Sequence, residues 1–226
     1  MKYPKILIAL AFAAALGAEA RAANLTISQT NTFSSLTTGT RNLSFNLLNS
    51  AFGSSVAISD IVSISITGLI NKSAGSWSFT NQDPTAIQVI FSQNTKGWFT
   101  SAKSIGFLGT EASPNFLSNF SDTLTVQPGD TLSGNFGAAG TGPLGGSLSS
   151  SFFSEYLGAG TFDIVVNGLL NTSVNGPGID QNTVSPRLSG NVVVSYEIVP
   201  EPSAASLLIF GLGGVFALRR CRRKAD

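Results

Sequence analysis

Apolar and polar residues alternate with a period of two along most of the chain. The alternation recurs in short runs from residue 43 to residue 198 and is clearest in 192–198. Its apolar members are Leu43, Phe45, Leu47, Val62, Ile64, Ile66, Trp77, Phe79, Ile87, Val89, Phe91, Phe162, Ile164, Val166, Val192, Val194, Tyr196 and Ile198. A period of two places every second side chain on the same side of a strand, so these runs predict β-strands with one buried face. Residues 147–157 could form either a strand or a short helix.

Residues typical of turns separate the predicted strands. Gln127-Pro128-Gly129-Asp130 has proline and glycine at the central positions that a type II turn prefers. This segment predicts a hairpin between strands at 122–126 and 131–136, and Asn81-Gln82-Asp83-Pro84 predicts another corner. The glycine-rich stretch 137–146 and the stretch 171–186, rich in Asn, Gly and Pro, predict long loops, the first of them mobile.

The order of these elements indicates the fold class. No stretch between residues 24 and 198 has the long 3.6-residue period of a helix that could connect parallel strands. The sequence therefore predicts an all-β fold, a single antiparallel β-sandwich of jelly-roll-like or Ig-like type, over residues 23–198. A domain of this size can enclose one hydrophobic core.

The N-terminal segment has the pattern of a secretory signal peptide. Lys2 and Lys5 precede an apolar run from Ile6 to Leu16, and small residues follow it. This order predicts a signal peptide over residues 1–22, because the apolar run is short for a membrane-spanning helix. Cleavage after Ala20 and cleavage after Ala22 both agree with the sequence.

The C-terminal segment, 199–226, has three parts in a fixed order. Val-Pro-Glu-Pro at 199–202 is followed by an uncharged apolar run at 204–218 and a basic tail at 219–224. As a helix, the apolar run would reach roughly 22 Å, which is marginal for a hydrocarbon core of about 30 Å. The cations of the tail would stay on the cytoplasmic side of the membrane. They are Arg219, Arg220, Arg222, Arg223 and Lys224.

These three parts closely resemble the PEP-CTERM sorting domain of Gram-negative envelope proteins. The resemblance implies that Pro200, Glu201 and Pro202 are recognised by a membrane-embedded exosortase. It also implies a transmembrane helix at 204–218, removal of the tail, and delivery of the exported domain to the cell surface, outer envelope or extracellular matrix. Glu201 would serve in recognition and not in catalysis.

The region between the two ends loosely resembles the choice-of-anchor E type of bacterial surface domain. The parallels are Ser28-Gln29-Thr30, the predicted strand at 60–70 leading to Trp77-Ser78-Phe79-Thr80-Asn81, and the closing stretch 190–196. The chain departs from that pattern at 48–54. The resemblance implies a fold, and the family has no activity to transfer.

Composition restricts the chemistry of the exported region. Residues 23–200 contain five basic and nine acidic residues, a net charge of −4, so nucleic acid is not an expected partner. The chain has no histidine and its single cysteine, Cys221, lies in the tail, which excludes Ser-His-Asp catalysis and thiol or imidazole metal sites. No catalytic residue, metal site or cofactor is expected. Asn171, Asn175, Asp180 and Asn182 are the best candidates for calcium, but a solvated loop is the favoured interpretation.

Trp98 and Phe99 are the candidate glycan contacts. Adjacent residues of a strand point to opposite sides, so we expect one of the two rings to be exposed, where it could stack on a sugar. The sequence thus favours a non-enzymatic surface or matrix protein that interacts structurally with its surroundings. The alternatives are a carbohydrate-binding module for exopolysaccharide and, less favoured, a glycan-active enzyme using paired carboxylates.

Overall fold

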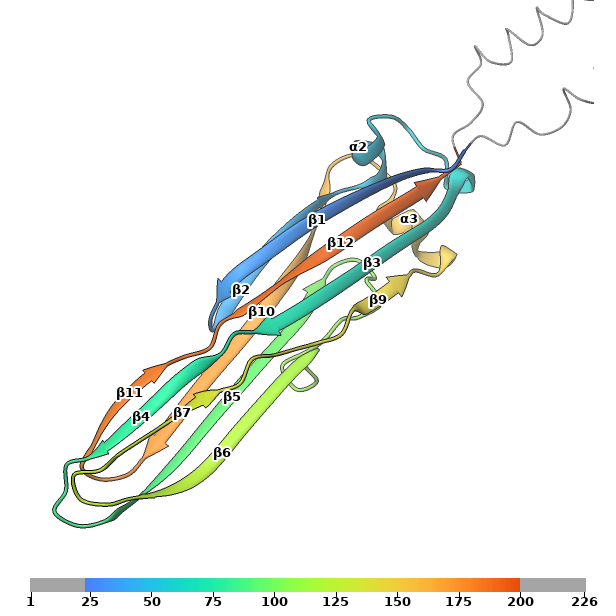
Figure 1. Ribbon diagram of the computed structural model, residues 1–226. Helices are drawn as coiled ribbons and strands as arrows, with labels where there is room; N and C mark the ends of the chain where they lie inside the picture. The colour runs from blue at the N-terminus through green and yellow to red at the C-terminus, as the bar shows by residue number, and fades with distance from the viewer. Residues whose placement is uncertain (1–22, 200–226) are drawn as a thin grey trace, which may run out of the picture. The chain divides into compact units, whose positions relative to one another are not determined.

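The computed structural model describes residues 23–199, and residues 26–197 form one compact unit (Figure 1). The predicted signal peptide and the predicted sorting segment from Pro200 onward lie outside the described residues. The strands are β1 (Leu25–Leu36), β2 (Gly39–Asn46), β3 (Ile61–Lys72), β4 (Gly75–Asn81), β5 (Ile87–Ser101), β6 (Phe116–Val126), β7 (Thr131–Phe136), β8 (Ala139–Gly140), β9 (Leu144–Ser147), β10 (Thr161–Asn175), β11 (Ile179–Val184) and β12 (Leu188–Ile198). The helical segments are α2 (Leu48–Phe52), η1 (Ile58–Asp60), η2 (Ser150–Phe152) and α3 (Phe153–Tyr156).

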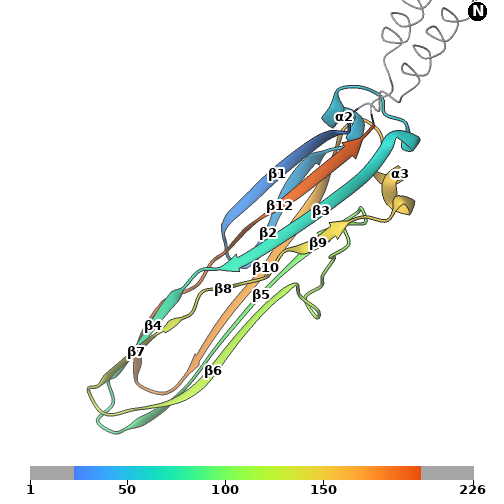
Figure 2. The same ribbon diagram turned by 45° about the vertical axis from the view of Figure 1, so that its right-hand side comes forward.

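The strands form antiparallel sheets in two layers, as predicted for an all-β chain (Figure 2). One layer is a continuous sheet, sheet B, with the order β2-β10-β5-β6. The other layer is divided into sheet A, with the order β1-β12-β3-β8 and β9 also paired to β3, and sheet C, with the order β11-β4-β7. The layers enclose the apolar core, so the domain is a sandwich with one whole layer and one interrupted layer.

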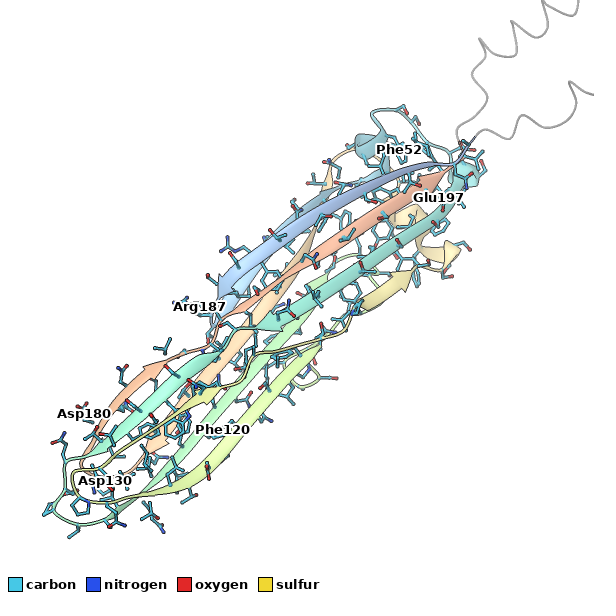
Figure 3. All side chains as sticks on the ribbon, viewed as in Figure 1. Phe52, Phe120, Asp130, Asp180, Arg187 and Glu197 are labelled. Atoms are coloured by element: carbon cyan, nitrogen blue, oxygen red, sulfur yellow. The ribbon has the colours of Figure 1, made fainter. Side chains whose placement is uncertain are left out.

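The interruption lies where β3 passes into β4 and where β11 passes into β12. Ser73 donates its N–H to Arg187 O (2.8 Å), and the Arg187 N–H donates to Ser73 Oγ (2.9 Å). Pro186, which has no N–H, precedes Arg187 in this link. Arg187 marks the break in Figure 3.

The break divides the domain into two halves that share β5 and β10. We call sheet A with β2 and the parts of sheet B behind it the proximal half, because β1 begins and β12 ends there. The distal half is sheet C with β6, residues 87–95 of β5 and residues 169–175 of β10. Each half has its own buried residues. The proximal core includes Phe33, Phe45, Ile64, Ile66, Phe99, Tyr156, Phe162, Ile164, Val192, Val194 and Tyr196, and the distal core consists of Phe79, Ile87, Val89, Phe91, Val126 and Phe136.

The alternating runs form strands as predicted, except at Leu47, which lies after β2 and caps α2, and at Val62, which has a different orientation. Ile64 and Ile66 are completely buried, whereas Val62, two residues earlier on the same strand, is 43% exposed. Ile61 takes the buried position at the start of β3. The predicted inward position of Val62 is therefore wrong, because the strand begins at the edge of the core, where alternation no longer guarantees cover.

The predicted hairpin at Gln127–Asp130 is wrong, although the turn itself is present. The Asp130 N–H donates to Gln127 O (3.1 Å), and Gly129 has φ +76°, the conformation that a type II turn requires of its third residue. However, β6 pairs with β5 in sheet B, and β7 pairs with β4 in sheet C. The turn therefore passes the chain from one layer to the other, because turn residues dictate chain reversal and not the choice of hydrogen-bond partner.

Asn81 is hydrogen-bonded both to the corner predicted at 81–84 and to the turn at 127–130. Its buried side chain donates from Nδ2 to Thr85 O (2.8 Å) and Val126 O (3.0 Å) and accepts the Asp83 N–H (2.8 Å). Its backbone exchanges hydrogen bonds with the turn, from Asn81 N to Asp130 O (3.0 Å) and from Gly129 N to Asn81 O (3.1 Å). One residue therefore joins both connections at the distal end of the domain.

Both stretches predicted as long loops contain strands. The stretch 137–146 includes β8 and part of β9, which pair with β3. Gly145, at φ +84°, lets β9 approach β3 closely, because a Cβ at this position would lie 2.3 Å from Ile66 O. The stretch 171–186 forms the end of β10 and all of β11, whose Val174 and Ile179 pack against the distal core. Few apolar residues suffice here, because the neighbouring strands of both layers supply most of the distal core.

The short helix that the sequence allowed within 147–157 is present as η2 and α3. Phe153 and Tyr156 are buried, and the Glu155 carboxylate accepts hydrogen bonds from Ser104 N (2.9 Å) and Ser104 Oγ (3.1 Å). Lys103 Nζ donates to Glu155 O (2.6 Å). The helix therefore anchors the loop that follows β5.

Candidate binding surface and sorting signal

The sorting residues Pro200, Glu201 and Pro202 and the basic residues 219–224 lie outside the described residues. The last described strand, β12, ends at Ile198, and Val199 alone separates it from Pro200. Among residues 23–199, the model contains no helix with the length and apolar character needed to cross a bilayer. In the sequence, the sorting signal follows the folded domain almost without a linker.

The outer face of sheet B presents rows of like residues across three strands. Asn94 of β5 lies between Asn171 of β10 and Asn119 of β6, and Ser92 lies between Ser173 and Ser121 in the next row. This part of the face is uncharged, and small hydroxyl and amide groups cover it. Such a surface offers many hydrogen-bond donors and acceptors but no arranged ionisable group.

Trp98 belongs to this outer face and lies four residues along β5 from Asn94. Its indole is partly buried, since Gly109 of the loop 102–115 packs against its Cβ. Asn167, directly opposite on β10, donates Nδ2 to Thr100 Oγ1 (3.1 Å). Leu117 of β6, 53% exposed, lies beyond Lys96 in the neighbouring row. The arrangement is an accessible ring beside amide and hydroxyl groups.

Phe99 does not share this face. Its side chain is completely buried, and its ring meets Phe107 edge to face with centroids 5.3 Å apart. The structure therefore places Phe99 in the proximal core, away from any surface ligand, and leaves the partly buried Trp98 as the outward-facing member of the predicted pair.

A shallow cleft of about 540 Å³ opens at the proximal end of the same face. It is lined by residues 100–103 of β5 and the loop after it, and by 161–163 and Val165 of β10. The Asp163 carboxylate accepts a hydrogen bond from Ser44 Oγ (2.6 Å), and Ser101 Oγ donates to Asp163 O (2.8 Å). Sequence reasoning missed this cleft, because its walls come from strands that are far apart in the chain.

The cleft shows no arrangement of paired acid and base. Asp163 is its one carboxylate, and the nearby Lys103 amine is engaged with Glu155 O (2.6 Å). Within residues 23–199 no three acidic, histidine or cysteine side chains gather as a metal site would require. What the cleft offers chemically is hydrogen bonding from hydroxyl, carboxylate and ammonium groups.

The calcium candidates are not brought together. Asn171 and Asn175 lie on β10 of sheet B, whereas Asp180 and Asn182 lie on β11 of sheet C. The two pairs therefore belong to different layers of the sandwich. Asn182 instead lines a small polar hollow on sheet C with Ser76, Ser78, Ser133 and Asn135.

Two buried tyrosines fix the proximal end of the core. Tyr196 Oη donates to Asn46 O (3.0 Å), and Tyr156 Oη donates to Ser104 O. Burial raises the pKa of both phenols well above the ordinary value, and the neighbouring Glu155 carboxylate adds to the effect on the pKa of Tyr156. Both tyrosines have a structural role, because each phenol donates its hydrogen bond to a backbone carbonyl.

Comparison with protein families decides the nature of the C-terminal segment. The model of the PEP-CTERM protein-sorting motif matches residues 199–224. The chain therefore carries a PEP-CTERM sorting motif at its C-terminal end. The motif supports export to the cell envelope or surface and sorting by an exosortase, as the sequence predicted.

Other comparisons add no function for the β domain. A comparison with characterised proteins gives no significant match. A chain in the structure of the infectious bursal disease virus Gx strain is 15% identical, with 81% of this chain and 42% of that chain covered and a TM-score of 0.21. A chain of the T13 particle of the same virus is 11% identical, with coverages of 80% and 41% and a TM-score of 0.19. This chain thus spans less than half of either viral chain, and TM-scores this low do not indicate a shared fold.

Proposed function

We propose that this PEP-CTERM protein is a non-enzymatic structural component of the cell surface or extracellular matrix. In this proposal the signal peptide at 1–22 directs export, and the apolar run at 204–218 holds the protein in the inner membrane. Exosortase then cuts near Pro200, Glu201 and Pro202 and releases the β domain. The observation that supports the proposal most strongly is the sorting motif that follows β12 after one residue.

The described domain supports a structural role through its surfaces. Its outer faces carry mainly Ser, Thr and Asn, and its core is formed by packed aromatic and aliphatic side chains. The two halves are held together by β5 and β10, which run through both of them. Such a domain suits a building unit better than a reaction site, because its polar groups are spread evenly and not gathered in a deep, dry pocket.

The test compares wild type with Glu201→Ala in the native host by intact mass and membrane fractionation. Wild type should lose the C-terminal tail and leave the inner membrane, whereas the variant should keep both the tail and its place in the membrane. Glu111→Ala, which removes an exposed glutamate of the loop 102–115, serves as the control and should be processed normally. Retention of the tail by wild type would overturn the sorting proposal.

Carbohydrate binding to exopolysaccharide is the second candidate function, and the position of Trp98 favours it. The ring lies on the same face as the cleft at Asp163 and as the asparagine row, so a sugar chain laid along β5 would meet a stacking surface and hydrogen-bonding groups. A glycan pull-down should lose at least about tenfold in retained polysaccharide with Trp98→Ala. Phe152→Ala, at an exposed aromatic of η2, is the control. Equal retention by both variants would remove this candidate.

A further inference from the structure

Strand β6 forms one edge of sheet B, and the middle of this strand is exposed. Residues 119–123 are all exposed, although Phe120 and Asp122 occupy the inward-facing positions of the alternation. Phe120 remains 37% exposed while its ring touches Phe91 and Phe136, at centroid distances of 5.5 and 6.1 Å (Figure 3). An inward aromatic that stays exposed indicates that the layer opposite β6 does not reach far enough to cover it.

Other stretches along the edges of sheet B are covered by side chains from outside the sheet. Gln29 of β1 exchanges two hydrogen bonds with the backbone of Asn46 on β2, one from Asn46 N to Oε1 (2.8 Å) and one from Nε2 to Asn46 O (3.0 Å). Beyond β2, Thr38 Oγ1 accepts the Leu170 N–H (3.0 Å). Beyond β6, the Phe99 N–H donates to Asn115 Oδ1 (2.9 Å). No comparable group bonds to the backbone of residues 119–123 from outside sheet B in the described part of the chain.

A buried cation lies beside this edge without a carboxylate partner among the described residues. Lys72, at the end of β3, is only 5% exposed, and its Nζ donates to Ser118 Oγ of β6 (3.1 Å). Burial lowers the pKa of Lys72. The side chain of Asp122, four residues further along β6, accepts the N–H of Thr123 (2.8 Å) as its one hydrogen bond among residues 23–199. Within one copy, the cation and the carboxylate are thus held apart by the length of the strand.

Antiparallel pairing of two β6 strands would bring these charges together. Opposed residues must share a face, so a register centred on Phe120 places Phe120 against Phe120 of the second copy and Ser118 against Asp122 of the second copy. Opposed side chains then have Cβ atoms about 4.5–5.5 Å apart, within reach of the Lys72 amine bonded to Ser118. The two-fold symmetry makes this contact twice. We infer that the protein associates with a second copy of itself through β6, with Phe120 at the symmetry axis and Lys72 paired with Asp122 across the interface.

The sequence of β6 agrees with such an interface. Asp122 is its one charged residue, so the pairing places no like charges opposite each other. Sheet B of one copy would continue into sheet B of the other, and Asn119 would lie opposite Ser121 of the second copy. Leu117, 53% exposed in the single copy, would lie opposite Thr123. Edge-to-edge pairing of this kind gives backbone hydrogen bonds and adds side-chain specificity.

Cysteine cross-linking tests the register directly. In full-length protein with Cys221→Ser, Phe120→Cys should give a disulfide dimer under mild oxidation, because directly opposed strand residues have the Cα separation that a disulfide needs. Thr123→Cys alone should stay monomeric, because the two copies of residue 123 would be about 20 Å apart. A mixture of Leu117→Cys and Thr123→Cys chains should cross-link. Failure of Phe120→Cys, or equal cross-linking by Thr123→Cys alone, would overturn the proposal.

A charge variant tests the Lys72 contact without disturbing the fold. Asp122→Asn keeps the oxygen that accepts the Thr123 N–H and should weaken dimerisation in sedimentation velocity by about tenfold or more. The control is Asp180→Asn, at an exposed carboxylate of β11, which should leave association unchanged. A dimer unaffected by Asp122→Asn would refute this pairing. A Phe120→Cys adduct of different mass in cells, with no homodimer of the purified protein, would show that another protein occupies the edge and would equally refute it.

Discussion

The proximal and distal halves of the domain share two long strands but differ in how their sheet edges end. In the proximal half, side chains of Gln29 and Asn115 bond to edge backbone groups that would otherwise face water. In the distal half, β6 ends the sheet without such cover, and the inward-facing Phe120 is left partly exposed. One half thus resists further pairing and the other permits it. A sheet edge that is neither paired nor covered is where association is expected.

The halves also differ in how their cores are fixed. The proximal core contains two tyrosines whose phenols bond to backbone carbonyls, whereas the distal core is a cluster of phenylalanines with Trp77. Polar anchors specify a unique arrangement, and stacked aromatic rings contribute mainly through buried area. Variants in the two halves should therefore respond to different perturbations.

The largest expected effect comes from the centre of the distal core. Phe91 touches Trp77, Phe79, Phe120 and Phe136, and it is completely buried. Phe91→Ala should lower the free energy of unfolding by about 3–5 kcal/mol, because it removes packing and leaves a cavity. Urea denaturation measures this loss. Ile90→Ala, its exposed neighbour, should change stability little, and a similar loss for both variants would contradict the assignment of the core.

The corner at the distal end should be the next most sensitive feature. Asn81→Ala removes the donor to Thr85 O and Val126 O and the acceptor of the Asp83 N–H. We expect a loss of about 2–3 kcal/mol in the free energy of unfolding, because buried carbonyl groups are left unpaired. Faster hydrogen exchange around residues 126–130 should accompany it. Asn182→Ala, on the exposed face of β11, is the control, and an equal loss there would argue against this role of Asn81.

Alkaline pH should weaken the proximal half selectively. The pKa values of Tyr156 and Tyr196 are raised by burial, so the unfolded chain ionises first, above about pH 10. The free energy of unfolding should be unaffected by these groups below pH 10 and then fall by about 1.4 kcal/mol per pH unit for each tyrosine. Tyr196→Phe should halve this slope in denaturation measured between pH 10 and 11.5. An unchanged slope would show that Tyr196 ionises equally easily in the folded protein.

The smallest expected effect on stability is the opening of the proximal edge. Gln29→Ala removes the two hydrogen bonds to Asn46 and should cost about 1 kcal/mol. The exchange rate of the Asn46 amide should rise, because its acceptor is lost. Thr30→Ala, at an exposed position of β1, should leave that amide protected. If Gln29→Ala also raises self-association, the contrast between covered and open edges gains support. If the exchange rate of the Asn46 amide does not change, Gln29 does not cover this edge.

The sequence by itself determined the class of the fold and the presence of a sorting signal at the C-terminal end. Alternation with a period of two predicted strands such as β5 and β12, because the requirement for one buried face acts on every second residue. The motif at 199–224 was readable because exosortase substrates share a linear signal. For the candidate surface, the same alternation predicted that one of Trp98 and Phe99 would face outward, but not which one.

Tertiary structure alone decided how the strands pair and which edges stay open. The turn at 127–130 has the residues of a hairpin, yet it joins β6 of sheet B to β7 of sheet C. The polar stretch at 171–186 forms strands because its first part pairs with β5 and its second part pairs with β4, contacts that its own sequence does not indicate. Local patterns act over a few residues, whereas strand pairing is selected by contacts between segments far apart in the chain. The cleft at Asp163, the cover of β2 and the open edge of β6 all depend on that selection, so none of them could be predicted from the order of residues.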